Sequence, residues 1–127
     1  MNHPTKLLYS KSHEWVALDG DHARIGVTDY AQEAMGDIVF VSLPAEGQDM
    51  TVGEAFAELE SVKAVAPVYA PVSGTISAVN EALLEAPETI NQAPYDAWII
   101  EVKEITDRET LMSSEEYEAF VAREKEA

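Results

Sequence analysis

Apolar and polar residues alternate over much of the chain, which indicates short β-strands. Residues 54–60 alternate acidic and apolar side chains, interrupted only at Phe56, as expected of a strand with one buried face. Similar patterns predict strands over residues 14–18, 23–27, 38–43, 74–79 and 97–102. Residues 38–43 are apolar on both faces, so we expect that strand to be buried. We expect a hairpin turn at Asp19-Gly20, a polar turn region over 47–53 and a loop over 91–96.

Helix signals between the strands are short. Asp29 and Gln32 have the spacing of a capping box, and Gly36 follows where that helix should end. Asn80 is placed to cap a second short helix, which Pro87 stops.

A longer helix is predicted at the C-terminus, over residues 113–127. Ser113 and Glu116 form a capping-box pattern, and Tyr117, Phe120 and Val121 make a narrow apolar stripe. We expect this stripe to anchor the helix onto the β-core. Residues 1–8 are expected to form an N-terminal tail, and the length of 127 residues suits a single domain over 1–127.

Lys63 stands apart from the other charged residues. It is the only Lys or Arg between Arg24 and Lys103, and it separates two predicted strands, so we expect it near the tip of a hairpin. Val62 and Ala64 flank it where Gly, Asn or Asp would be usual, so turn propensity alone does not explain this turn. A surface lysine is most often a solvated charge. We interpret Lys63 as an amine displayed for a modifying enzyme.

The composition narrows the possible functions. Acidic residues number 24 against 8 basic ones, for a formal net charge of −16, which disfavours binding to nucleic acid or anionic membranes and favours a monomer. With no cysteine there is neither a disulfide nor a thiolate metal site. No apolar run reaches membrane-spanning length and no signal-peptide pattern is present, so we expect a cytoplasmic bacterial protein.

Catalytic patterns are weak throughout the sequence. His3, His13 and His22 lie in the tail or the first hairpin, without metal-ligand spacing, and His13 is expected to be a partly exposed strand residue. Glycine-rich phosphate loops are absent from the sequence. We therefore expect that this protein is not an enzyme and has no metal site.

The residues around Lys63 are similar to a known motif. Glu60-Ser61-Val62-Lys63-Ala64, followed by Val68-Tyr69-Ala70-Pro71-Val72-Ser73-Gly74, resembles the lipoyl-lysine hairpin of the glycine cleavage system H protein family. Further blocks agree in order, from about Tyr9 to Phe120: Ser12-His13-Glu14-Trp15-Val16, residues 26–33 and 35–41, Leu43-Pro44, and Pro94-Tyr95 before Trp98.

The resemblance implies a fold and a function. The fold would be mainly β, a barrel-sandwich hybrid of two small sheets like lipoyl and biotinyl carriers, with short added helices and a C-terminal helix. Lys63 would carry covalent lipoate, attached by a lipoate ligase or octanoyltransferase. The carrier would shuttle an aminomethyl group from a pyridoxal-phosphate glycine decarboxylase (P protein) to a tetrahydrofolate-dependent aminomethyltransferase (T protein). Dihydrolipoyl dehydrogenase (L protein) would then reoxidise the arm.

The resemblance also implies a cleft that shelters the arm. Ser12 and Glu14 match the cleft-lining positions of the family, where the Glu14 carboxylate would pair with the cationic amine; the alternative is an ordinary exposed strand residue. Many members carry an acid four residues after the lysine, where this chain has Pro67. The segment from Pro94 to Trp98 is one residue shorter than the usual pattern.

Three alternatives remain at this stage. Biotinyl domains usually place Met on both sides of the lysine, unlike Val62 and Ala64. A lipoyl domain of a 2-oxoacid dehydrogenase is disfavoured by the blocks from Ser12 to Gln32. The third alternative is an H-protein paralogue that relays lipoate or acts as a scaffold.

Overall fold

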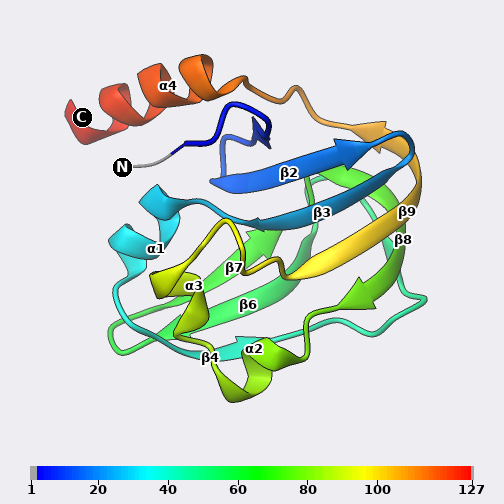
Figure 1. Cartoon of the computed structure of the whole chain (residues 1–127), viewed down its shortest axis with the longest axis horizontal. Helices are drawn as coiled ribbons and strands as arrows, with labels where there is room; N and C mark the ends of the chain where they lie inside the picture. Colours follow the sequence, from blue (N-terminus) through cyan, green and yellow to red (C-terminus); the bar gives the residue numbers. More distant parts are fainter. Residues whose placement is uncertain (1–2, 127) are drawn as a thin grey trace.

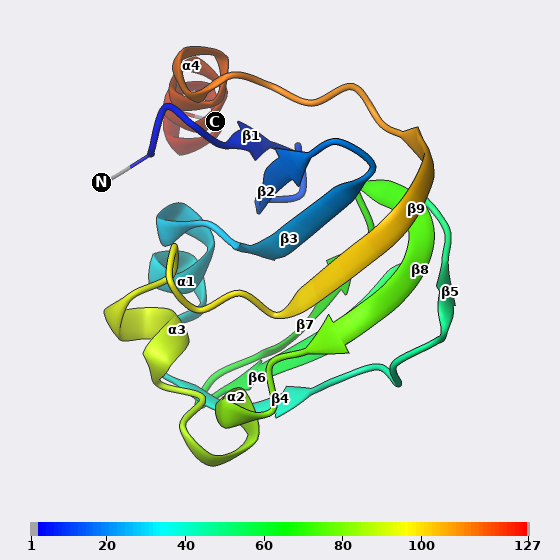
Figure 2. The ribbon, with the colours of Figure 1, turned by 45° about the vertical axis from the view of Figure 1, so that its right-hand side comes forward.

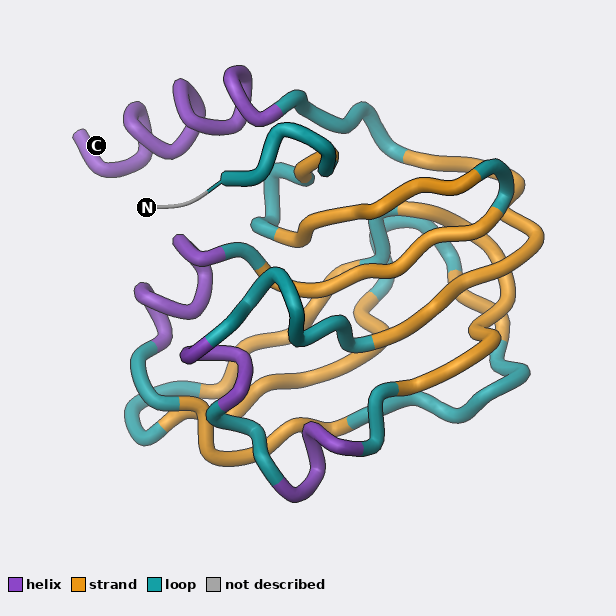
Figure 3. Tube along the Cα trace, viewed as in Figure 1, coloured by secondary structure: helices purple, strands orange, loops and turns teal. Residues whose placement is uncertain are grey.

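The computed structural model describes residues 3–126, which form two antiparallel β-sheets with helices at their ends (Figures 1 and 3). The larger sheet has six strands in the order β1-β2-β3-β9-β8-β5. Their bounds are Leu8–Tyr9, Glu14–Asp19, His22–Val27, Ile100–Arg108, Val72–Val79 and Asp49–Met50. The smaller sheet has the order β4-β6-β7, with bounds Ile38–Ser42, Ala55–Ser61 and Val65–Tyr69.

Four helices complete the described chain: α1 Asp29–Met35, α2 Ala82–Glu85, α3 Thr89–Gln92 and α4 Ser114–Glu126. Figure 2 shows β8 and β9 curving around one side of the molecule, so that the large sheet folds over the small one. This architecture confirms the expected fold class: mainly β, with two sheets, short helices and a C-terminal helix.

The main apolar core lies between the two sheets. Val16 and Ile25 of the large sheet and Leu59 and Val68 of the small one belong to the same buried cluster. Alternation along β6 places Ala57, Leu59 and Ser61 inside, while Glu58 and Glu60 face solvent. The hydrophobic pattern of the sequence therefore decides which face of β6 meets the core.

A second apolar cluster lies between α4 and the large sheet, and it consists of Tyr9, Trp15, Tyr117 and Val121. The rings of Tyr9 and Tyr117 stack with centroids 4.7 Å apart. The capping box is present, because Ser113 N donates to Glu116 Oε1 at 2.9 Å and Glu116 N donates to Ser113 Oγ at 3.2 Å. These contacts confirm the predicted anchoring stripe.

Two predictions of helix caps were wrong. Thr28 rather than Asp29 caps α1: Thr28 Oγ1 accepts from Ala31 N at 3.2 Å, and the Asp29 carboxylate instead accepts from Gln32 Nε2 at 2.7 Å. Asn80 does not cap α2 with its side chain, because Asn80 Nδ2 donates to Trp98 O at 2.8 Å.

The predicted strand over 38–43 is only half buried. β4 is an edge strand of the small sheet, with Ile38 and Val41 inside but Val39 and Phe40 48% and 54% exposed. The expected loop over 91–96 begins inside α3. The last strand begins at Ile100 rather than residue 97 and continues to Arg108, and the polar turn over 47–53 contains the short strand β5.

Candidate functional site

Lys63 lies in the turn between β6 and β7, as predicted, and we call residues 61–65 the lysine turn. Ser61 N donates to Ala64 O at 2.8 Å, which closes the turn. Ser61 Oγ accepts from Lys63 N at 3.3 Å and from Ala64 N at 3.1 Å. The Ser61 hydroxyl thus provides the acceptor for two backbone N–H groups in a turn that contains no glycine.

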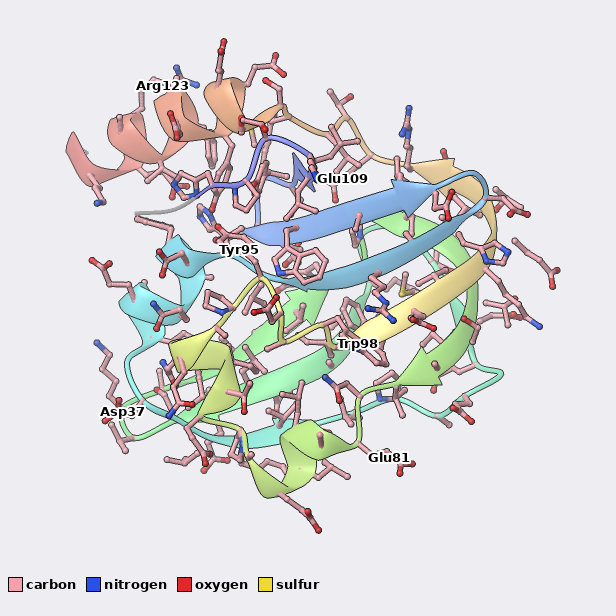
Figure 4. All side chains as sticks on the ribbon, viewed as in Figure 1. Asp37, Glu81, Tyr95, Trp98, Glu109 and Arg123 are labelled. Atoms are coloured by element: carbon pink, nitrogen blue, oxygen red, sulfur yellow. The ribbon has the colours of Figure 1, made fainter. Side chains whose placement is uncertain are left out.

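The connection between α1 and β4 supports the lysine turn from one side. Val62 N donates to Asp37 O at 3.2 Å. Gly36 has a φ of +79°, and a Cβ at that position would lie 3.5 Å from Lys63 Cε, so the lysine stem lies close to this glycine. Figure 4 shows Asp37 at the same end of the molecule as the β6–β7 turn.

Asn91, at the end of α3, holds the same connection. Asn91 Nδ2 donates to Gly36 O at 2.9 Å and to Gln32 Oε1 at 3.0 Å, and Ile38 N donates to Asn91 Oδ1 at 2.9 Å. Sequence reasoning placed Asn91 in a loop and gave it no role. Its partners lie 53 to 59 residues away, so no local pattern marks it.

Exposed apolar side chains surround the lysine turn. Val62 is 73% and Val65 56% exposed, and Phe40 lies in the same row of the small sheet as Glu60 and Val65. The acidic residues Glu58 and Glu60 are also exposed. Lys63 is therefore displayed on a face that mixes apolar and acidic groups.

A cleft of about 200 Å³ separates α1 from the β6–β7 hairpin, and we call it the α1 cleft. It is lined by Ser12, His13, Glu14, Val27, Tyr30, Ala31, Ala34, Met35, Leu59, Ala66, Pro67 and Val68. Leu59 and Ala66, which both line the cleft, pair across the hairpin. Leu59 is four residues before Lys63, and four residues of extended strand span about 13 Å. The structure thus brings Ser12 and Glu14 into one cleft with the hairpin that carries Lys63.

Glu14 is a buried carboxylate at the polar end of this cleft, with a relative exposure of 1%. Its Oε1 accepts from Ser10 Oγ at 2.5 Å and from Ser12 Oγ at 2.6 Å, and its Oε2 accepts from Tyr69 N at 3.3 Å. Burial raises the pKa of Glu14, although these hydrogen bonds oppose the rise. Glu14 is thus not an ordinary exposed strand residue.

Within residues 3–126, no cationic side chain forms an ion pair with Glu14. Pro67 lines the cleft, and Glu14 is the only acid among the lining residues. The site can therefore accept one cationic group, which would find hydroxyl oxygens and a carboxylate without a competing lysine or arginine.

His13 borders the cleft but faces the C-terminal helix. It lies in a bend with a φ of 72°, and so is not the strand residue that the sequence suggested. The hydroxyl of Tyr117 lies 2.7 Å from His13 Nδ1, and Glu124 Oε2 lies 2.9 Å from His13 Nε2. Burial lowers the pKa of His13, against the effect of Glu124. These contacts tie the rim of the cleft to α4.

The segment from Pro94 to Trp98 contacts the other end of α1. Trp15 Nε1 donates to Pro94 O at 3.0 Å, and Asp29 N donates to Tyr95 Oη at 3.1 Å. Figure 4 places Tyr95 beside the start of α1. This segment therefore helps to hold the helix that forms one wall of the cleft.

Other candidate chemistry is sparse. A cavity of about 370 Å³, on the surface of β2, β3 and β9, contains the Arg24–Glu101 ion pair and includes neither Lys63 nor Glu14. Among residues 3–126, no three His, Asp or Glu side chains are grouped to hold a metal ion. None of the helices in this part of the chain is long and apolar enough to cross a membrane.

Comparisons with known proteins agree with one another. The family model described as "Glycine cleavage H-protein" matches residues 7–124. The glycine cleavage system H protein of Lachnoclostridium phytofermentans is 52% identical over 121 residues, covering 94% of this chain and 95% of the relative. That of Geobacillus kaustophilus is 51% identical over 124 residues, covering 95% and 98%. The crystal structure of the Mycobacterium marinum H protein matches with a TM-score of 0.89 at 38% identity, covering 94% of this chain and 99% of that one.

Proposed function

The chain belongs to the glycine cleavage H-protein family, and from that premise we propose that it is the lipoyl carrier of glycine cleavage, with Lys63 as the attachment site. The observation that carries this proposal is the pairing of the lysine turn with the α1 cleft on one hairpin. A lysine displayed on a turn is accessible to an acylating enzyme, and a cleft along the same strands gives the arm a place to return.

The lining of the cleft suits a lipoyl group. Val27, Met35 and Leu59 offer an apolar wall, and Ser12 and Glu14 offer a polar end. Its volume of about 200 Å³ is below the range for drug-sized ligands, which suits the terminal part of an arm that is tethered elsewhere. An attached lipoyl group would supply a redox-active disulfide that can accept an aminomethyl group, and the residues of the α1 cleft would hold the end of the arm.

We assign Glu14 the role of holding a cationic amine. Burial makes its negative charge costly, and a primary ammonium in the cleft would compensate that cost. Ser10 and Ser12 orient the carboxylate by donating to Oε1. Because this chain has Pro67 where many members of the family carry an acid, Glu14 would be the only carboxylate that holds the amine.

The partners follow from the family. They are the P, T and L proteins, together with a lipoate ligase or octanoyltransferase that modifies Lys63. We further propose a cytoplasmic monomer, because a net charge of −16 opposes self-association. The chain itself would act as a carrier, and any turnover surviving Lys63→Ala would contradict this.

Intact mass of the protein from its native host, with peptide mapping across Lys63, tests the attachment site. One lipoyl increment on Lys63, lost in Lys63→Arg, is expected. A biotin increment, or an unmodified lysine in cells that lipoylate other proteins, would contradict the proposal.

Reconstitution with the decarboxylase tests the pathway. Lipoylated protein should support glycine-dependent bicarbonate exchange. A lipoylated protein that fails to do so would favour the relay or scaffold alternative, which needs Lys63 but not this exchange.

A further inference from the structure

We propose that Asn91 is a positioning residue for the lysine turn, holding the backbone that supports Lys63. This inference rests on the proposed function of Lys63, although the structural part of it can be tested without lipoate. The three hydrogen bonds of the Asn91 side chain all go to residues 32–38, which comprise the last turn of α1, its connection to β4 and the first residue of β4.

The Asn91 side chain uses both of its donor hydrogens and one of the two acceptor positions on Oδ1. Its Oδ1 accepts from Ile38 N, and the two hydrogens on Nδ2 go to Gly36 O and Gln32 Oε1. The orientation of the amide is set by chemistry, because a backbone N–H only donates and a backbone C=O only accepts. A side chain that lacks either the donor or the acceptor cannot make these three hydrogen bonds.

The peptide group between Asp37 and Ile38 connects Asn91 to the lysine turn. Ile38 N–H and Asp37 C=O belong to the same planar trans peptide unit and point in opposite directions. Asn91 Oδ1 binds the N–H side, and Val62 N donates to the C=O side at 3.2 Å. Fixing the plane of this peptide from one side therefore fixes the acceptor that Val62 uses on the other.

The segment that carries Asn91 is itself anchored. Ile90 is fully buried in the main core, and Asn91 N donates to Glu88 O at 3.0 Å. Gly36 O, the second backbone group held by Asn91, belongs to the residue that lies against the lysine stem. Asn91 thus connects the buried residue Ile90 to the two places where the α1–β4 connection contacts the lysine turn: Asp37 O with Val62 N, and Gly36 with the Lys63 stem.

The α1 cleft shares this support. Asn91 also donates to Gln32 Oε1, on the helix that forms one wall of the cleft. One side chain therefore sets the position of the wall relative to the lysine turn. Loss of Asn91 should loosen the turn and displace the wall together.

The test compares Asn91→Asp with Asn80→Asp. The carboxylate of Asn91→Asp can still accept from Ile38 N, but it cannot donate to Gly36 O or Gln32 Oε1. Asn80 is the matched control, because it is also half-buried and its Nδ2 donates to a backbone carbonyl, that of Trp98, at 2.8 Å. Asn91→Ala, which adds no charge, serves as the second variant if Asn91→Asp does not fold.

Two readouts are expected to change. The Val62 amide should exchange with solvent about tenfold faster in Asn91→Asp than in the wild type, the scale of one or two lost hydrogen bonds. The KM of the apo protein for a lipoate ligase should rise about tenfold with kcat unchanged, because a smaller fraction of the protein presents the turn correctly. Asn80→Asp should change neither.

Unchanged Val62 exchange and KM in both Asn91 variants, or equal changes in Asn80→Asp, would overturn the inference. Failure of the proposed function would look different. In that case the wild type itself would not be lipoylated on Lys63, while Val62 exchange would still report on the hold exerted by Asn91.

Discussion

Two hairpins of this molecule end in turns of different construction. The β2–β3 hairpin closes after the pair Asp19–His22 by means of Gly20, whose φ is +64°. The β6–β7 hairpin has no glycine in its turn and uses the Ser61 side chain instead. The first turn follows from local backbone preference, whereas the second depends on a specific side chain.

Each turn also shares a backbone hydrogen bond with a neighbouring segment. Ile105 N donates to Asp21 O at 3.0 Å in the first, and Val62 N donates to Asp37 O at 3.2 Å in the second. The second neighbour is in turn held by Asn91, from outside the small sheet. Both turns thus have a tertiary backbone contact, but only the support of the lysine turn is itself held by a distant side chain.

The largest expected effect comes from moving the lysine between these turns. Lys63→Arg should abolish lipoylation, because the guanidinium does not form the amide. Adding Asp21→Lys, which places a lysine in the exposed β2–β3 turn, should not restore it. Intact mass after incubation with lipoate ligase measures both, and modification of the new lysine would show that presentation by the β6–β7 turn is unnecessary.

Removing the side chain that closes the lysine turn should have the next largest effect. Ser61→Ala loses the acceptor for Lys63 N and Ala64 N, so the KM for lipoate ligase should rise roughly tenfold at unchanged kcat. Ser73→Ala is the control, since Ser73 Oγ accepts from Val52 N at 3.0 Å away from the lysine. Equal kinetics for the two variants would argue against the role of Ser61.

Glu14 connects the two hairpins, because it begins β2 and accepts from Tyr69 N at the end of β7. Burial raises its pKa in the folded protein above the ordinary value of 4.5. As pH rises above 4.5 the unfolded chain loses this proton first, so the folded state becomes progressively less stable relative to Glu14→Gln. We expect Glu14→Gln to gain on the wild type by roughly 1–3 kcal/mol between pH 4 and pH 8, on top of a pH-independent cost for the acceptor that its amide no longer offers to Tyr69 N.

Urea unfolding between pH 4 and pH 8 measures this difference. Glu58→Gln, on the exposed face of β6, should stay within about 0.5 kcal/mol of the wild type throughout. A gain for Glu14→Gln that does not grow with pH would mean that the buried charge is not the cause.

The smallest expected effect concerns the glycine turn. Gly20→Ala should destabilise the protein by about 1 kcal/mol, because the positive φ is strained for any residue with a Cβ. The space around Gly20 is open, so no clash adds to this cost. Thermal unfolding should show the loss while lipoylation stays unchanged; a change in lipoylation would show that the two hairpins are not independent.

Prediction from sequence succeeded where the signal was local. The alternation of β6 and the Ser113–Glu116 capping box both appear in the structure, since each depends on residues a few positions apart. It failed where a distant group competed. Asn80 was expected to cap α2 but donates to Trp98 O, and β4 was expected to be buried but lies at a sheet edge.

The candidate site divides in the same way. Lys63 at a hairpin tip follows from the sequence, because strand patterns flank it on both sides. Ser12 and Glu14 came only from the family resemblance. The burial of Glu14 against Tyr69 could not be read from a strand pattern that places Glu14 like any surface acid.

By itself, the sequence determined most of the strands, the position of the lysine turn and the family, because hydrophobic periodicity and continuous motifs are properties of neighbouring residues. The two-sheet architecture followed from the family resemblance. Only the tertiary structure decided that Glu14 is a buried acid without a cationic partner within residues 3–126, and that Asn91 holds the support of the lysine turn. The physical reason is that burial and hydrogen-bond partners depend on contacts across 50 or more residues, such as the 53 between Ile38 and Asn91.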